Sequence, residues 1–231
     1  MSKRQPGNVR GRKTSSRSGR QPARFTLDPY FACLIFAGMG LGTLSLGASP
    51  RLVVLWTTLI GLWLVYREGQ DLRLRYRFAD LGRGAAMGLA VGLPLLLLAF
   101  RPLATAIPIL YVSVTAPSLE SVAGTTVFCA LVLLAPLAEE LFFRDLLHRE
   151  RGLWIAVALY AAAGLVFFLP TAGDFAVVLL AVSGANALLG IWYGVLYERY
   201  GMATALACHG TVNFFLLFLP AVLSQLDLFT R

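Results

Sequence analysis

Seven apolar stretches constrain the fold of this 231-residue chain more than any other feature, because most of them are long enough to cross a lipid bilayer. A membrane-spanning helix needs about 20 mainly apolar residues. The predicted spans are Tyr30–Ala48, Leu52–Tyr66, Leu81–Phe100, Val122–Phe143, Leu153–Leu169, Phe175–Tyr197 and Met202–Val222. Of all residues, 58% are hydrophobic and 14% are charged, against about 25% charged in soluble domains. The sequence therefore predicts an all-α, polytopic transmembrane helical bundle with seven or eight membrane segments.

The N-terminal tail carries the whole net charge of +8. Its basic residues, which no acidic residue accompanies, are Lys3, Arg4, Arg10, Arg12, Lys13, Arg17, Arg20 and Arg24. Residues 1–24 have too few apolar side chains to form a core, so we expect a disordered tail followed by one transmembrane domain, residues 25–231. A basic run beside a membrane segment favours a cytoplasmic N-terminus that contacts anionic lipid headgroups. A nucleic-acid-binding arm is the alternative, but the position beside a span leads us to expect no nucleic-acid partner.

Loop charges distinguish seven spans from eight. The segment Pro102–Leu119 is apolar but contains three prolines, which suits a re-entrant or interfacial piece. With seven spans, the basic loop Arg67–Arg77 and the segment Arg144–Arg151 lie on the side of the tail, and the C-terminus lies on the other side. An eighth crossing by Pro102–Leu119 would place Arg144–Arg151 outside, against the positive-inside rule. We therefore favour seven spans.

Two adjacent glutamates, Glu139 and Glu140, lie near the end of the fourth span. A carboxylate inside a membrane costs about 2.5 kcal/mol or more on insertion scales, so such residues are usually functional. Residues four apart share a helix face, which places Arg144 beside Glu140 and turns Glu139 about 100° away. One interpretation is an intrahelical ion pair, with Glu139 bonded to a neighbouring helix. The functional interpretation is that Arg144 keeps one carboxylate ionised while apolar surroundings favour the neutral form of the other, which gives paired acids separate roles.

A second polar pair, His209 and Asn213, lies in the last span and shares one helix face. Such groups also serve as packing contacts between membrane helices, which is the alternative interpretation. Together with the glutamates they supply a general base, an imidazole and an amide donor. These are the groups needed to attack an amide with water and to stabilise the resulting oxyanion.

Residues 139–144, Glu-Glu-Leu-Phe-Phe-Arg, match the EExxxR motif of the CPBP family, and residues 209–213, His-Gly-Thr-Val-Asn, match its HxxxN motif. Over about residues 122–219 the chain resembles these CAAX-protease and bacteriocin-processing (Abi) intramembrane glutamic endopeptidases, which include the Rce1-type enzymes. The resemblance implies metal-independent hydrolysis, without a cofactor, by a glutamate-activated water. On this resemblance Glu140 would be the general base, Glu139 and Arg144 would set its charge state, and His209 and Asn213 would stabilise the oxyanion.

The same resemblance implies a place and a class of substrate. We expect a multi-pass protein of a cell membrane of the bacterial inner-membrane type. The expected substrate is a membrane protein, a prenylated protein or a sorting-signal peptide that is cleaved near its terminus.

One motif of the family differs in this chain. The family carries FxxxH on the intervening helix, where the histidine helps to position the water, whereas this chain has Phe167 and Thr171. A threonine hydroxyl can hydrogen-bond water but does not act as a base near neutral pH. Two functions fit: an active protease in which Thr171 positions water more weakly, or an inactive relative that binds a membrane partner or confers immunity. The costly glutamate pair favours the protease.

Three other classes fit the sequence less well. A zinc protease needs about three protein ligands, and the sequence contains neither an HExxH motif nor a thiolate cluster. A serine protease would pair Ser183 with His209, but it leaves the glutamates unexplained, and Ser183 with Gly184 suits close helix packing. A transporter would use glutamate and histidine as a proton relay, but the sequence has no visible repeat halves or paired broken helices.

Small and aromatic residues predict how the bundle packs. Glycines at spacings suited to close helix contact are Gly38, Gly40, Gly42, Gly84, Gly88 and Gly92. Tryptophans near span ends, as in an aromatic belt at the membrane surface, are Trp56, Trp63, Trp154 and Trp192.

Overall fold

The computed structural model describes residues 28–68, 77–111 and 122–223, and the elements in these ranges are all helical. In chain order they are α1 (Pro29–Gly42), α2 (Ala48–Arg67), α3 (Phe78–Tyr111), α4 (Val122–Phe128), η1 (Cys129–Leu134), α5 (Ala135–Glu139), η2 (Glu140–His148), α6 (Arg149–Arg151), α7 (Leu153–Phe167), η3 (Leu169–Thr171), α8 (Ala172–Tyr200), α9 (Met202–Asn213), η4 (Phe214–Phe218) and α10 (Leu219–Leu223). The predicted basic tail, residues 1–24, lies outside the described residues.

The helices are long and apolar enough for a membrane bundle. Five could cross a bilayer: Ala48–Arg67, Phe78–Ile107, Thr125–Arg151, Ala176–Tyr200 and Met202–Leu223. Two more, α1 and α7, are apolar but shorter. Within the described ranges this makes seven helical rods, one for each predicted span, and it confirms the all-α polytopic membrane fold.

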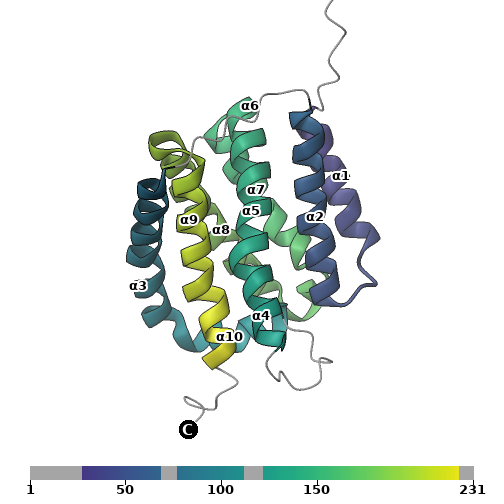
Figure 1. The fold of residues 1–231 in the computed structure, drawn as a ribbon. Coiled ribbons are helices and arrows are strands. Elements are labelled where there is room, and N and C mark those ends of the chain that lie inside the picture. Colours follow the sequence, from purple (N-terminus) through teal and green to yellow (C-terminus); the bar gives the residue numbers. More distant parts are fainter. Residues whose placement is uncertain (1–27, 69–76, 112–121, 224–231) are drawn as a thin grey trace, which may run out of the picture.

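The rod that runs from α4 to α6 lies at the centre of the bundle (Figure 1). It stands between α2 on one side and α9 on the other, with α7 and α8 behind it, α1 beyond α2 and α3 beyond α9. Phe142, Phe143, Leu146 and Leu147 on this rod are each at most 1% exposed. Half of the most apolar stretch of this rod is buried, the largest share among the five long helices. The span with the glutamates is therefore the core of the fold.

A line of glycines on α3 brings that helix against α9. A Cβ atom on Gly84 would lie 2.3 Å from the carbonyl oxygen of Thr204, and one on Gly88 would lie 2.6 Å from that of Cys208. Small residues at this spacing let two helix backbones approach closely. The predicted packing role is confirmed for these two glycines, but Gly38 has no atom within 4 Å of a Cβ position.

Arg51 stabilises the ends of both short helices. Its side chain is 1% exposed and donates from Nη2 to the carbonyls of Gly40, at 2.8 Å, and Val166, at 2.7 Å. Its Nη1 donates to the carbonyl of Phe167. The last carbonyls of a helix lack partners within the helix, and a cation there interacts favourably with the helix dipole. Arg51 therefore satisfies the C-terminal turns of α1 and α7 where they stop inside the bundle.

The helix α3 continues through Pro102 and Pro108, where the sequence indicated a separate re-entrant piece. At 34 residues it is about 51 Å long, which exceeds the bilayer core of about 30 Å. In Figure 1 its last part turns toward the middle of the bundle at the lower end. Prolines are tolerated in membrane helices where neighbouring groups satisfy the freed backbone. The described part of Pro102–Leu119 is thus an extension of the third rod and forms no eighth crossing.

Candidate active site

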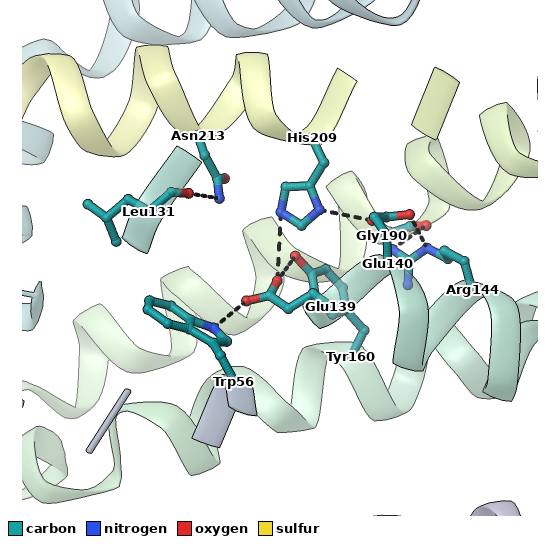
Figure 2. A network of polar contacts seen from close by, with 9 residues as sticks. All are labelled: Trp56, Leu131, Glu139, Glu140, Arg144, Tyr160, Gly190, His209 and Asn213. Atoms are coloured by element: carbon teal, nitrogen blue, oxygen red, sulfur yellow. Dashed lines mark hydrogen bonds and ion pairs between the residues drawn. The ribbon is translucent and has the colours of Figure 1, made fainter. Parts of the chain in front are cut away.

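Glu139 is held by two aromatic donors from other helices (Figure 2). It is the last residue of α5 and its side chain is 12% exposed. Trp56 on α2 donates from Nε1 to Oε1 at 3.0 Å, and Tyr160 on α7 donates its hydroxyl to Oε2 at 2.9 Å. Each carboxylate oxygen can accept further hydrogen bonds. Glu139 is thus fixed in orientation and still able to accept a proton.

Glu140, the first residue of η2, is fully enclosed. Its Oε1 lies 2.9 Å from Nδ1 of His209 on α9, and its Oε2 lies 3.7 Å from Nε of Arg144. The ion pair with Arg144 joins residues four apart, as the sequence predicted. The opposite charges compensate one another in an environment where an isolated charge would be costly.

Arg144 lies between two tyrosine rings, with its guanidinium carbon 4.7 Å from the ring centre of Tyr160 and 5.9 Å from that of Tyr193. Its Nη2 donates to the backbone carbonyl of Gly190 at 3.3 Å. A Cβ atom on Gly190 would lie 3.0 Å from the Tyr160 ring, so a glycine at this position on α8 lets the two helices close around the arginine. The cation is therefore held by ring faces and a backbone carbonyl as well as by Glu140.

His209 connects the two glutamates. Its ring stacks on Tyr193, with centroids 4.4 Å apart and an interplanar angle of 17°. Because a carboxylate only accepts, the bond to Glu140 places a proton on Nδ1 of His209. The other nitrogen, Nε2, then points toward Glu139, 3.7 Å from its Oε2. The imidazole thus presents its second nitrogen on the side of Glu139 (Figure 2).

Asn213 lies one turn after His209 on the same helix, as predicted. Its Nδ2 donates to the carbonyl of Leu131 at 2.9 Å. Leu131 belongs to the π-helical segment η1, and two further π-helical segments adjoin the motif residues: η2 begins with Glu140, and η4 follows Asn213. Such turns are rare in proteins and frequently occur at functional sites. One hydrogen of the Asn213 amide remains for another acceptor.

A cavity of about 140 Å³ brings these groups together. Its lining includes Glu139, His209 and Asn213, and Glu140 is absent from it. A water molecule occupies about 30 Å³ in the liquid, so the cavity has room for several waters. Of the predicted catalytic residues, Glu139, His209 and Asn213 therefore meet at this cavity, and Glu139 is the carboxylate turned toward the open space.

Phe167 closes one wall of this cavity. Its ring is 6% exposed and lies 6.1 Å from the ring of Trp56 and 5.4 Å from that of Phe36. Thr171 ends the short turn η3, and its side chain lies outside the described residues. The predicted water-positioning role of Phe167 and Thr171 stays a prediction.

Sequence reasoning missed three residues that line the cavity: Trp56, Tyr160 and Asn186. Trp56 was assigned to an aromatic belt, which is wrong for this residue, because it is 3% exposed and bonds to Glu139. Tyr160 and Asn186 are polar residues in the middle of apolar helices, and that position was the available signal. Their distance from the glutamates depends on how the helices rotate, which one sequence does not reveal.

The structure also bears on the other classes of function. The hydroxyl of Ser183 donates to the carbonyl of Ala161 at 2.9 Å, and the residue does not line the cavity that contains His209. Ser183 therefore has the packing role that the sequence favoured. Within the described ranges, no group of three or more His, Cys, Asp or Glu side chains is arranged to hold a metal ion.

Comparison with protein families agrees with the motifs. Residues 121–215 match the family model described as type II CAAX prenyl endopeptidase Rce1-like. This part of the chain is similar to an Rce1-like domain. This domain includes both glutamates, Arg144, His209 and Asn213, and it confirms the resemblance to the CPBP family. No curated protein and no solved structure gave a significant match to the chain.

Proposed function

We propose that this protein is an intramembrane glutamic endopeptidase that cleaves a membrane-associated, prenylated or sorted protein near its terminus. The observation that carries the proposal is the cavity in which one carboxylate, Glu139, meets His209 and Asn213. The Rce1-like domain supports the class of enzyme. A carboxylate, an imidazole and an amide can together perform this hydrolysis, so the proposal includes no metal and no cofactor.

The cavity favours Glu139 over Glu140 as the general base. A base must lie within hydrogen-bond reach of the water that it deprotonates, and only Glu139 of the pair lines the open space. Glu140 is 0% exposed and is engaged with Arg144 and His209. The roles that the family resemblance suggested are therefore exchanged: Glu139 takes the proton, and Glu140 orients His209.

In this mechanism the water oxygen attacks the carbonyl carbon of the peptide while Glu139 accepts a proton from the water. The carbonyl oxygen becomes an oxyanion, which the free amide hydrogen of Asn213 stabilises; His209 adds a second donor when Nε2 carries a hydrogen as well as Nδ1. The carbon–nitrogen bond then breaks, and Glu139 returns the proton to the leaving nitrogen. The products are a carboxyl terminus and an amine.

An apolar groove gives the substrate a route from the membrane. It has a volume of about 680 Å³ and lies between the last part of α3 and the first half of α8. Leu103, Leu110, Val182 and Ala185 line both this groove and the cavity, so the two spaces adjoin. A substrate held in the bilayer by an apolar segment or a lipid chain suits such a route, whereas a soluble peptide does not.

Charge at the helix ends supports a cytoplasmic N-terminus in a cell membrane of the bacterial type. Arg67, Arg149 and Arg199 lie in the last turns of the rods that end at the upper side of Figure 1. By the positive-inside rule this side is cytoplasmic. The tail that precedes α1 belongs to the same side, where it would contact anionic lipid headgroups.

The test is terminal-peptide proteomics on membranes from cells that carry the wild type, Glu139→Gln or Glu140→Gln at matched expression. We expect Glu139→Gln to reduce cleavage of the substrate by about 10²- to 10⁴-fold, the usual contribution of a general base. Glu140→Gln leaves Arg144 without its counter-charge, but a glutamine oxygen still accepts a hydrogen bond from His209, so the variant that remains folded in thermal unfolding should lose less activity than Glu139→Gln. The matched control is Glu68→Gln, because Glu68 is an exposed residue at the end of α2. This variant should cleave the substrate at the wild-type rate.

Two results would change the proposal. Full loss in Glu140→Gln with retained cleavage in Glu139→Gln would return the role of base to Glu140. The threonine at position 171 favours one other candidate, an inactive relative that binds a membrane partner or confers immunity. If the wild type cleaves nothing while Glu139→Gln keeps the full cellular effect of the protein, this binding function replaces the protease.

A further inference from the structure

Asn186 on α8 is a polar residue of the cavity that the mechanism above leaves unused. It is half-buried and lines the same space as Glu139 and His209. Its amide forms no hydrogen bond with any residue in the described part of the chain. By contrast, Asn213 already donates to Leu131. Asn186 therefore has its hydrogen-bonding capacity available for whatever enters the cavity.

The residues around Asn186 hold this amide in place. A Cβ atom on Gly164 of α7 would lie 2.7 Å from Nδ2 of Asn186, so a glycine is needed there for the amide to fit. One turn earlier on α8, Ser183 donates to Ala161 of α7 at 2.9 Å, which fixes how the two helices are rotated against each other. The position of the amide is thus determined by the packing of α7 against α8.

The rest of this wall of the cavity is apolar. Val182, Ala185 and Leu189 line it on the same helix as Asn186. An amide in apolar surroundings costs free energy unless a partner satisfies it. No protein group among the described residues is that partner, so the amide is available to a molecule in the cavity. The cavity has room for water beside a carboxylate that can accept a proton.

We propose that Asn186 is a water-orienting residue of the hydrolysis, an inference that rests on the proposed protease function. Its Oδ1 accepts one hydrogen of the attacking water while Glu139 accepts the other. This arrangement leaves a lone pair of the water oxygen free to face the carbonyl carbon of the substrate. During attack the hydrogen bonded to Glu139 moves to the carboxylate, and the hydrogen bonded to Asn186 stays on the oxygen that becomes part of the new carboxyl group.

This role explains how a chain with threonine at position 171 can orient water. The family's histidine corresponds to Thr171, at the end of the turn η3, whereas Asn186 comes from the middle of α8. An amide oxygen accepts a hydrogen bond as an imidazole nitrogen does, but it does not take up the proton. Asn186 therefore orients the water, and the proton transfer falls to Glu139 alone.

The test compares the initial rate of substrate cleavage in membranes for the wild type, Asn186→Leu, Asn186→His and Leu188→Ala, with Glu139→Gln as the blank. Leucine has nearly the size of asparagine without its hydrogen bonds, so the rate should fall about 10- to 100-fold, in kcat with little change in KM. Histidine restores an acceptor and should recover most of the rate. Leu188→Ala, which changes an exposed side chain on the same helix that does not line the cavity, should keep the wild-type rate.

The outcomes separate this inference from the proposed function. Wild-type cleavage by a folded Asn186→Leu protein would overturn the role of Asn186 and leave the protease standing. If the wild type and Glu139→Gln show the same cleavage, or none, both the protease function and the role of Asn186 are overturned. Thermal unfolding in detergent shows whether each variant is folded. If Asn186→Leu does not accumulate, the smaller Asn186→Ala replaces it under the same criterion.

Discussion

Replacement of Gly88 by alanine should separate α3 from α9 and disturb the active site from outside it. The new Cβ would lie 2.6 Å from the carbonyl oxygen of Cys208 and 2.6 Å from Cβ of Thr211, whereas ordinary contacts begin at 3.4 Å. The overlap is therefore about 0.8 Å (3.4 minus 2.6), and it falls on atoms of a helix that cannot rotate away. Overpacking of this kind costs about 1–3 kcal/mol.

Gly82→Ala on the same helix is the matched control, because no atom lies within 4 Å of its Cβ position. Both variants change glycine to alanine in a helix and share the gain in helix propensity of about 1 kcal/mol, so their difference isolates the steric cost. At about 2–4 °C per kcal/mol, Gly88→Ala should unfold about 2–12 °C below Gly82→Ala.

The same displacement reaches His209, which follows Cys208 directly. Because α9 lies between α3 and the central rod, a shift of about 0.8 Å away from α3 would press His209 against Glu140 and distort their 2.9 Å hydrogen bond. Thermal unfolding of purified protein in detergent and the cleavage rate in membranes measure the two effects. If Gly88→Ala is as stable as Gly82→Ala and equally active, α3 and α9 do not approach each other as closely as the structure indicates.

Three further predictions test other contacts. Trp56→Phe keeps an aromatic ring but removes the donor to Glu139, so the initial cleavage rate should fall about 10-fold, and an unchanged rate would show that this bond does not orient the base. Arg51→Met leaves carbonyls at the ends of α1 and α7 without a donor, so thermal unfolding should show a protein that is less stable by about 2–5 kcal/mol. Arg101 is exposed, and Arg101→Met should leave the stability unchanged. Thr171→His supplies the histidine of the family motif and should preserve or raise the cleavage rate; complete loss in a folded protein would contradict the alignment of that motif.

The sequence predicted the helices well because length and hydropathy determine a membrane span almost alone. Each of the seven predicted stretches corresponds to one rod. The prolines of α3 were misinterpreted, since their effect depends on neighbouring groups that stabilise a long helix. Arg51 gave no recognisable signal, because an arginine near the start of a span is common and two of its three partners, Val166 and Phe167, lie more than 100 residues away along the chain.

The motif residues were predictable as a set but not in their individual orientation. Spacing of four residues placed Arg144 beside Glu140 and Asn213 beside His209. Which glutamate faces the cavity depends on the rotation of the central rod, and that rod changes from α-helix to π-helix between the two residues. Periodicity arguments assume one helix type throughout, so they could not resolve this point.

The two short rods have a consequence for the lipid around the protein. At 1.5 Å per residue, the 14 residues of α1 and the 15 of α7 span about 21 and 22 Å, less than the hydrocarbon thickness of about 30 Å. A bilayer adapts to a short hydrophobic surface by thinning beside it, at a modest cost in elastic energy. Headgroups and water would then come closer to the depth of the glutamates on this flank. A substrate whose scissile bond lies at the lipid–water boundary would have a shorter distance to travel, and the protein would favour membranes with shorter acyl chains.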